Sequence, residues 1–437
     1  MEKTLQGKVL DEERTIRDRI RKNVSDFFEL KRRDSKFTPI KDRIRYSGPV
    51  YDEKEVTQMM ERILDGWFGV SSYSDEFEKN FSKIFGVSSS VLTNSGSSAN
   101  LLAVSALCSN QVPNRLKPGD EVITPACTFS TTFNPIVQNS LTPVLLDVQP
   151  GTYNINPEQL REAFSRKTRA IMLPHTLGNP NDMDAVMDFV KEHDLFLVED
   201  VADALGSSFG GKKLGSFGNF GTFSFYASHQ ITLGEGGAVA VRDKRFEPII
   251  RSLRNWGRGE GPFDDDWTKG TIIEGYDNRY LYVTIGYNLK PLEFQAAMGL
   301  EQLKRIDGFI KIRKKNFNAL LEFFSSYEDQ FILPESLPKA DPCWFGFPLT
   351  LKKEAKFKRK DFLDWLEKHN IETRLLFAGN IIRHPAYREV VYRKVGNLEN
   401  SDYNLKNSFF IGVYPGIDSE RLNFMVDTLK KFLDKFN

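Results

Sequence analysis

The chain has 437 residues, enough for two or three domains with a large hydrophobic core. Its 60 Lys and Arg residues balance its 59 Asp and Glu residues, so charge gives no case for binding nucleic acid or an acidic membrane surface. The N-terminal stretch lacks the apolar segment of a signal peptide, and no run approaches the roughly 18 apolar residues of a membrane span. We therefore expect a cytoplasmic protein. Cys108, Cys127 and Cys343 show no CxxC spacing, which argues against a zinc knuckle or a disulfide framework.

The pattern of apolar and charged residues predicts an α/β protein in three parts. Residues 1–45 are predicted to form a charged helical extension, and an amphipathic helix is expected over 53–66. Seven short apolar runs follow, several of them separated by helical stretches, and each is predicted to be a strand: 90–94, 121–126, 143–148, 170–175, 195–200, 222–227 and 238–241. This alternation favours a mostly parallel, seven-stranded sheet covered on both faces, within a large domain over 46–300. A long helical pattern from about 292, a strand-like WFGFPLTL and a final helix predict a smaller α/β domain over 301–437.

Three motifs follow predicted strands. TNSGSSANLLAVSAL, from Thr93, is a strand end, a Gly-Ser turn and a helix start, which together can bind an anion. Alone it also fits an ordinary serine-capped surface helix. Asp200 ends a buried strand, at the edge where ligands of open α/β sheets bind, although a helix cap would fit it equally well. Phe129 lies in a loop after another strand, where a core role is the simpler interpretation of this residue alone.

A fourth motif, SFYASHQITLGEGG over residues 224–237, removes the ambiguity of the other three. With GYNLKPLEFQAAMGL over 286–300, this order of motifs resembles the fold-type I, pyridoxal-phosphate-dependent aminotransferases of nucleotide-linked sugars, the DegT/DnrJ/EryC1/StrS family. The resemblance extends from about residue 46 to the end. It implies a fold-type I α/β architecture and a homodimer with shared active sites.

The resemblance also assigns the cofactor contacts. It implies that the cofactor phosphate is bound by Gly96, Ser97 and Ser224, and by Asn288 of the neighbouring subunit. By the same resemblance Phe129 would stack on the pyridine ring and Asp200 would bind its nitrogen. Asp203 stands where the aminotransferases usually carry Gln near the ring hydroxyl, which puts that contact in doubt.

His229 stands where these aminotransferases carry the lysine that binds the cofactor covalently, and imidazole cannot replace that bond. The pattern SFY-x-x-H-x-x-T-x-GEGG resembles more closely a smaller group, the 3-dehydratases of 4-keto-6-deoxy nucleotide sugars. That likeness implies pyridoxamine phosphate left free in the site, with His229 as a base whose ordinary pKa lies near 6.5.

One branch of this group uses a reductase and a [2Fe–2S] cluster held by four cysteines. Here the two corresponding regions, EDVADALG with Val201 and Ala202, and NWGRGEGPFDDDWTKG, contain no cysteine. Because such a cluster needs thiolates, we predict no iron–sulfur cluster and no metal. The other branch, which restores its cofactor with L-glutamate and releases ammonia, is therefore the expected chemistry.

Basic residues are candidates for holding the nucleotide diphosphate or the glutamate carboxylate: Arg374, which lies in TRLLFAGN, Arg258 and Arg254. His175, in LPHTLGNP, is a further candidate for sugar or cofactor, and a structural role fits it equally well. The sequence leaves open GDP or CDP, and hexose or heptose. It also leaves three other functions open: a sugar aminotransferase, the reductase-coupled dehydrase, and an inactive cofactor-binding regulator.

Overall fold

The structure, a computed structural model, describes residues 2–33, 36–259 and 272–436. Its centre is an eight-stranded sheet in the order β1-β9-β8-β5-β4-β2-β3-β14. The seven longer strands are β1 (Ser89–Thr93), β2 (Glu121–Pro125), β3 (Thr142–Leu146), β4 (Thr168–Pro174), β5 (Phe196–Asp200), β8 (Phe220–Ser224) and β9 (Gly237–Val241). Only β9 runs antiparallel to its neighbours in this sheet. The predicted α/β class with a mostly parallel sheet is confirmed, and each of the seven predicted runs overlaps one of these strands.

The sheet has one strand more than predicted. The eighth, β14 (Arg393–Lys394), comes from the C-terminal part of the chain and pairs in parallel with Val144 and Leu145 of β3. The Val395 N–H extends this pairing, donating to the Leu145 carbonyl at 2.9 Å. Two consecutive basic residues make no apolar run, so the sequence pattern carried no signal for this strand.

Helices cover both faces of the sheet. Successive strand residues point to opposite sides, so the apolar strands present side chains for burial on each face. In β5, for example, Leu197 packs in one apolar cluster and Val198 in another. The helices α3 (Ser72–Phe85) and α7 (Met183–Glu192) contribute to the first cluster, whereas α4 (Gly96–Leu107) and α8 (Glu247–Arg254) contribute to the second. The remaining helices of this part are α2 (Glu53–Leu64), α5 (Ser130–Gln138) and α6 (Gln159–Ala163).

A second, four-stranded sheet lies in the C-terminal part, in the order β10-β12-β15-β13. Its strands, all antiparallel to their neighbours, are β10 (Phe331–Ile332), β12 (Gly346–Leu351), β15 (Ser408–Gly412) and β13 (Thr373–Leu375). Its helices are α10 (Arg359–Lys368), α11 (Glu399–Asn407) and α12 (Ser419–Leu433). A small third sheet joins β11 (Ala340–Asp341), β6 (Ser208–Phe209) and β7 (Lys212–Lys213). Short 3₁₀ turns occupy Thr176–Gly178, Lys244–Phe246, Asn278–Tyr280, Ser325–Tyr327, Ile381–Arg383 and Pro385–Tyr387.

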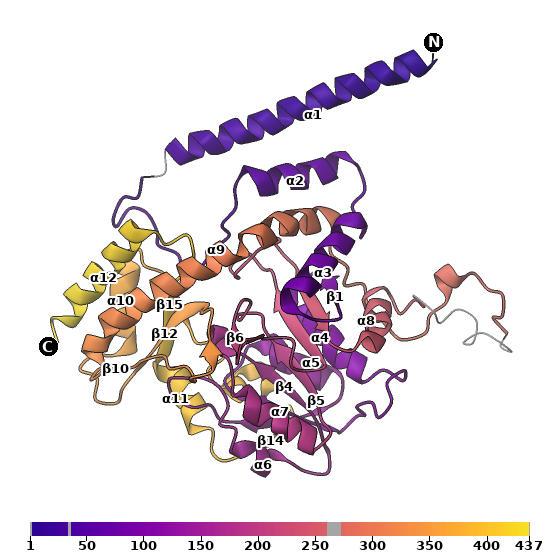
Figure 1. The fold of residues 1–437 in the computed structure, drawn as a ribbon. Helices are drawn as coiled ribbons and strands as arrows, with labels where there is room; N and C mark the ends of the chain where they lie inside the picture. The colour runs from indigo at the N-terminus through magenta and orange to yellow at the C-terminus, as the bar shows by residue number, and fades with distance from the viewer. Residues whose placement is uncertain (1, 34–35, 260–271, 437) are drawn as a thin grey trace.

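The long helix α9 (Glu293–Phe324) runs from the first part of the molecule to the second (Figure 1). Ala296 and Leu300, near its start, pack in the core of the main sheet, while Phe317 and Phe324 pack in the core of the second sheet. The boundary expected between residues 300 and 301 falls within this helix. The division into a domain over 46–300 and one over 301–437 stays a prediction.

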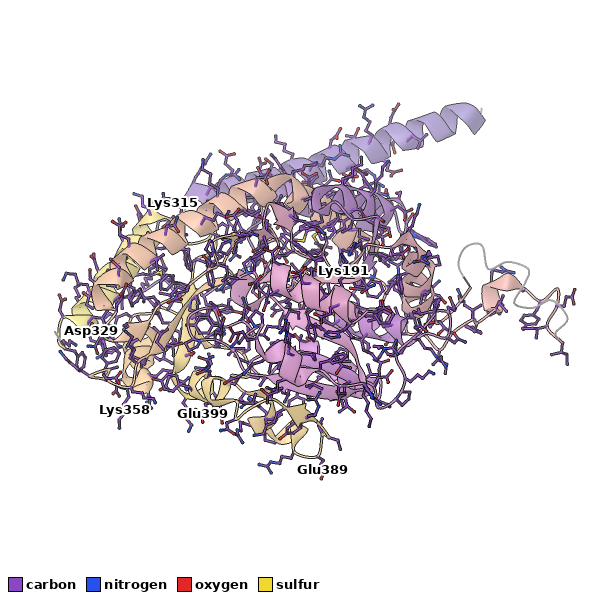
Figure 2. All side chains as sticks on the ribbon, turned by 60° about the horizontal axis from the view of Figure 1, so that its bottom comes forward. Lys191, Lys315, Asp329, Lys358, Glu389 and Glu399 are labelled. Carbon is purple, nitrogen blue, oxygen red and sulfur yellow. The ribbon has the colours of Figure 1, made fainter. Side chains whose placement is uncertain are left out.

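The N-terminal helix α1 (Glu2–Arg33) lies over α2 and reaches beyond the rest of the molecule (Figure 1). Arg17 and Arg21 hold it there through ion pairs with Glu61 of α2, at 2.8 and 2.7 Å. None of the helices in the described part of the chain is long and apolar enough to cross a membrane. Charged side chains lie at the periphery, including Lys315, Asp329, Lys358 and Glu389 (Figure 2). They are of both signs, in agreement with a net charge near zero.

Candidate active site

The carboxyl ends of β1, β8, β5 and β4 meet at one edge of the main sheet and border a cavity of about 360 Å³. Ligands of open α/β sheets bind at this edge. The cavity is lined by the loops after these strands, by the segment before α2 and by parts of the second sheet. The structure brings these predicted site residues together around it: Gly96, Ser97, Phe129, His175, Asp200, Asp203, Ser224, His229 and Arg374.

The anion-binding turn is the first turn of α4. Ser95 caps the helix, since its Oγ accepts a hydrogen bond from the Ser98 N–H at 3.1 Å. Gly96 follows and packs so closely on β8 that an added Cβ would lie 2.5 Å from the Ser224 Cβ. Gly237 of the GEGG motif packs in the same way against Ser95, whose carbonyl an added Cβ would overlap. The two glycines therefore let free N–H groups of a helix start meet the Ser224 hydroxyl, and such a turn fits a phosphate.

The Asp200 carboxylate is held from three sides. Its Oδ2 accepts hydrogen bonds from Asn100 Nδ2 at 2.9 Å and Thr132 Oγ1 at 2.7 Å, and its Oδ1 accepts one from the Ala202 N–H at 3.1 Å. A fixed anion at the end of β5 can pair with a protonated ring nitrogen.

Aromatic side chains also line the cavity. The Phe129 side chain is 53% exposed although it lines the cavity, so one face of its ring is free for a planar ligand. Phe377 meets it edge-on, with ring centroids 6.1 Å apart. Phe345 and Phe410, from the second sheet and its approach, complete this side of the cavity.

His229 lies in the loop between β8 and β9, and its backbone N–H donates to the Tyr226 carbonyl at 3.0 Å. The Thr232 hydroxyl donates to the Phe225 carbonyl at 3.3 Å and accepts from the Gly234 N–H at 2.9 Å, and Gly234 adopts a φ of 78° that favours glycine. Burial, with a smaller effect of the Arg313 charge, lowers the pKa of His229 to about 3. The ring is therefore neutral at pH 7, further from protonation than the ordinary value near 6.5 would make it.

The Asp203 carboxyl approaches the His229 ring, with Oδ1 3.5 Å from Nδ1. Burial raises the pKa of Asp203 to about 8, and the nearby Asp200 carboxylate adds to this, while the Arg313 charge opposes it. No lysine is among the described residues that line the cavity.

Two further candidates also border the cavity. The Arg374 guanidinium lies over the Tyr46 ring, 4.2 Å from its centroid, and Nη2 forms an ion pair with Glu372 at 2.6 Å. Its side chain keeps 46% of its surface exposed, so it remains accessible to an anion. The His175 ring is fully buried, and both of its nitrogens have protein partners: Nε2 lies 3.2 Å from Glu199, and Nδ1 accepts from the Asn181 N–H at 3.2 Å.

Three predicted residues lie outside this cavity. Arg254 is 4% exposed and forms an ion pair with Glu78 at 3.2 Å, a contact typical of a structural residue. The Arg258 guanidinium stacks on Trp256 at 4.7 Å, and Asn288 Oδ1 accepts a hydrogen bond from Lys290 at 2.7 Å. Roles for these three residues toward ligands stay predictions.

The sequence reasoning missed several residues of the site. Asn100 lies one helical turn after Gly96, where a buried amide in an apolar helix was the available signal. Thr132 is a buried residue of α5 and lies one helical turn after Phe129, the residue before that helix. Tyr46 comes from the segment before α2, far away in sequence, and nothing local indicated its position.

The predicted absence of a cluster is tested only in part. In the described ranges, no group of three or more His, Cys, Asp and Glu side chains is placed to hold a metal ion. Most of the second region lies at 260–271, outside the described residues. The absence of an iron–sulfur cluster therefore stays a prediction.

The sequence signature of the DegT/DnrJ/EryC1/StrS aminotransferase family matches residues 50–430. The chain belongs to this family. It is 43% identical over 429 residues to the dTDP-4-dehydro-2,6-dideoxy-D-glucose 3-dehydratase of Saccharopolyspora spinosa, covering 96% of this chain and 92% of that protein. It is 44% identical over 396 residues to the lipopolysaccharide biosynthesis protein RfbH of Salmonella typhimurium, covering 88% and 91%. A crystal structure of GDP-4-keto-6-deoxymannose-3-dehydratase with a trapped PLP-glutamate geminal diamine is similar in fold, with a TM-score of 0.79, 30% identity, and 88% and 99% coverage.

The predicted resemblance to this family and its 3-dehydratases is thereby confirmed, and pyridoxal phosphate is the cofactor of the family's solved members. The residues of this cavity fit that group. Because Gly96 has no side chain, the start of α4 lies directly against Ser224, and a Cβ at Gly96 would stand 2.9 Å from the Ser224 Oγ. Asp200 and Phe129 line the same cavity, so a carboxylate and an aromatic ring are available there to a pyridine ring, and residue 229 is a histidine and not a lysine.

Proposed function

We propose that the protein removes the 3-hydroxyl group of a nucleotide-linked 4-keto-6-deoxy sugar, with pyridoxamine phosphate as cofactor and L-glutamate as amino donor. The products are a 4-keto-3,6-dideoxy sugar, ammonia and 2-oxoglutarate. Oxidation of glutamate supplies the electron pair that replacement of the hydroxyl by hydrogen consumes, so the reaction needs no external reductant. The observation that carries the proposal is His229 in place of the covalent lysine, inside a cavity that is also lined by residues proposed to hold the cofactor: Gly96, Ser97, Phe129, Asp200 and Ser224.

The site residues have separate tasks in this reaction. Gly96, Ser97 and Ser224 bind the cofactor phosphate at the start of α4, Asp200 pairs with the ring nitrogen, and Phe129 covers one ring face. When bound, the cofactor supplies an electron sink for proton removal next to its ring.

His229 carries the proton chemistry. Its buried imidazole is neutral at pH 7, so a ring nitrogen can accept a proton and return it to the oxygen of the departing 3-hydroxyl. A lysine at this position would instead bind the aldehyde form of the cofactor and favour amino transfer. Histidine leaves the amine form free.

The substrates are recognised around the rim. Arg374, exposed beside Tyr46, is the first candidate for the glutamate carboxylate or the nucleotide diphosphate, because a guanidinium binds either in a bidentate manner. Arg258 and His175 are further candidates. The relatives act on dTDP- and GDP-linked sugars by their names, so the nucleotide of this protein remains to be tested among dTDP, CDP and GDP. A role in surface polysaccharide synthesis agrees with the name of the Salmonella relative.

The active protein is a homodimer in this proposal. Asn288 is exposed, lies outside the cavity of its own chain, and follows the exposed Tyr282 and Ile285. An apolar exposed face of this kind is suited to a second subunit, whose cofactor phosphate Asn288 would reach.

The test is incubation of the purified protein with L-glutamate and a panel of dTDP-, CDP- and GDP-linked 4-keto-6-deoxy sugars, followed by mass spectrometry and an ammonia assay. A deoxyketone formed with an equal amount of ammonia supports the proposal. An amino sugar would identify an aminotransferase, turnover only with a reductase would identify the coupled dehydrase, and no product with any sugar would favour a regulator.

A further inference from the structure

Asp203 and His229 form a pair built by two neighbouring parallel strands. Asp203 lies in the loop after β5 and His229 in the loop after β8, and these strands are hydrogen-bonded along the sheet. Asp203 Oδ1 lies 3.5 Å from His229 Nδ1, and both side chains border the cavity, with about 15% of their surface exposed. Both residues of the pair therefore belong to the wall of the cavity.

The enclosed nitrogen of the ring lacks a hydrogen bond. His229 Nδ1 is buried and has no partner within hydrogen-bonding distance, which costs free energy for a polar atom in such a place. The Asp203 carboxyl can satisfy it, since its Oδ1 is 3.5 Å away and a small closing movement would form the hydrogen bond. Because Nδ1 is the enclosed nitrogen, Nε2 is the one left for the cavity.

A buried arginine, Arg313, contacts the backbone of His229. Arg313 of α9 is 1% exposed, and its guanidinium donates to the Phe345 carbonyl at 3.0 Å and to the His229 carbonyl at 3.4 Å. None of the ion pairs found among the described residues involves Arg313. The Arg313 charge favours the ionised form of Asp203, whereas Asp200 and burial oppose it. Other titratable groups that border the cavity are Tyr46, His175, Tyr226 and Arg374, and Cys343 and Tyr414 lie near Arg313.

We propose that Asp203 is the positioning residue of His229: its carboxyl holds Nδ1, directs Nε2 to the substrate and shares one proton with the ring. This inference rests on the proposed function, because it assumes that His229 moves the proton of the dehydration. It also gives Asp203 a task other than the cofactor contact that the family's Gln makes.

The shared proton accounts for both halves of the proton transfer. With Asp203 ionised and the proton on Nδ1, Nε2 has a free electron pair and accepts a proton, and the resulting imidazolium faces the carboxylate. That proton then passes from Nε2 to the 3-hydroxyl oxygen, which leaves as water with the electron pair of its C–O bond. The pair returns to its starting state. Burial raises the pKa of Asp203 to about 8, so the share of molecules in this ionised starting state increases as the pH rises toward that value.

The first test uses the full-length protein and needs no turnover. The chain has five histidines, so labelling their Cε1 carbons with ¹³C gives few NMR signals, and His229→Asn identifies the signal of His229. We expect this signal to titrate near pH 8 with the ionisation of Asp203. Asp203→Asn should abolish that step and Asp203→Glu should retain one, while the signal of the remote His369 stays unchanged. A His229 signal that titrates identically in wild type and Asp203→Asn would overturn the pairing.

The second test separates this inference from the proposed function. Where wild type dehydrates a sugar, Asp203→Asn should lower kcat by about 10- to 100-fold with little change in KM, and remove the rise of the rate toward pH 8 that the ionisation of Asp203 causes. Equal rates and pH profiles for the two proteins would refute the positioning role and leave the dehydration standing. If no sugar is dehydrated but the two NMR signals differ as expected, the proposed function fails and the pairing holds.

Discussion

Replacing His229 by lysine should change which reaction the site supports. A lysine at this position would stand in the same enclosed turn, where burial and the Arg313 charge lower the pKa of His229 to about 3. The same two causes disfavour an ammonium ion, so a lysine here would be partly neutral and nucleophilic at pH 7. It would bind the aldehyde form of the cofactor covalently. His229→Lys should therefore lose dehydration and gain a covalent cofactor.

The size of the loss follows from the group removed. A positioned acid–base residue contributes about 10²- to 10⁴-fold to a rate, or about 2.7–5.4 kcal/mol of barrier. The upper part of this range is expected here, because among the described residues that line the cavity the only other histidine is His175, whose ring nitrogens are both bonded to protein groups. Amino transfer to the 4-keto group would then become measurable, to the extent that the pocket accepts the amino sugar.

The assay combines rates with covalent trapping. Borohydride followed by peptide mass spectrometry should fix the cofactor to position 229 in His229→Lys, and to no residue of the site in wild type. His229→Asn is the matched control: it should lose dehydration and trap nothing. If His229→Lys and His229→Asn both dehydrate the sugar at the wild-type rate, His229 does not carry the proton and the mechanism is wrong.

Three other predictions concern the reductant, the phosphate turn and pH. Wild type should turn over with L-glutamate in the presence of a chelator and without NADH, and strict dependence on an added electron donor would contradict the glutamate route. Gly96→Ala should weaken cofactor binding at least 10-fold in a fluorescence titration, because the new Cβ would lie 2.5 Å from the Ser224 Cβ and displace the turn; unchanged affinity would place the phosphate elsewhere. The pKa of Asp203 is raised from 3.8 to about 8, so the folded protein keeps a proton that the unfolded chain has lost, and stability falls as pH rises through this range. Between pH 6.5 and 8, above the usual titration of His229, the melting temperature of cofactor-free wild type should drop more than that of Asp203→Asn, and parallel curves would contradict the raised pKa.

The sequence predicts those parts of the structure that have a local signal. The seven longer strands of the main sheet are apolar runs, and Asp200 and His229 stand at fixed places in recognisable motifs. Contacts between distant segments carry no such signal. Tyr46 reaches the cavity because the Ile44 backbone bridges to Ile371, more than 300 residues further along the chain.

Side-chain roles divide in the same way. Arg374, Arg258 and Arg254 look alike as basic residues near motifs, and only packing separates them. Arg254 is buried against Glu78, whereas Arg374 remains half exposed at the cavity. The pairing of Asp203 with His229 depends on β5 and β8 being neighbours in the sheet, which the order of the strands along the chain does not determine.

The eighth strand has a consequence for biosynthesis. Strand β14 covers the outer edge of β3, although some 250 residues separate them in the chain. Until residues 393–394 leave the ribosome, β3 presents an open row of backbone donors and acceptors to other nascent chains. Chains that end early, by a nonsense mutation or by engineered removal of the C-terminal part, should therefore aggregate through this edge instead of yielding a smaller soluble enzyme. Arg393 is paired with Glu121 at 2.8 Å, whereas the exposed Lys394 adds a positive charge at the completed margin that repels a second copy of the sheet.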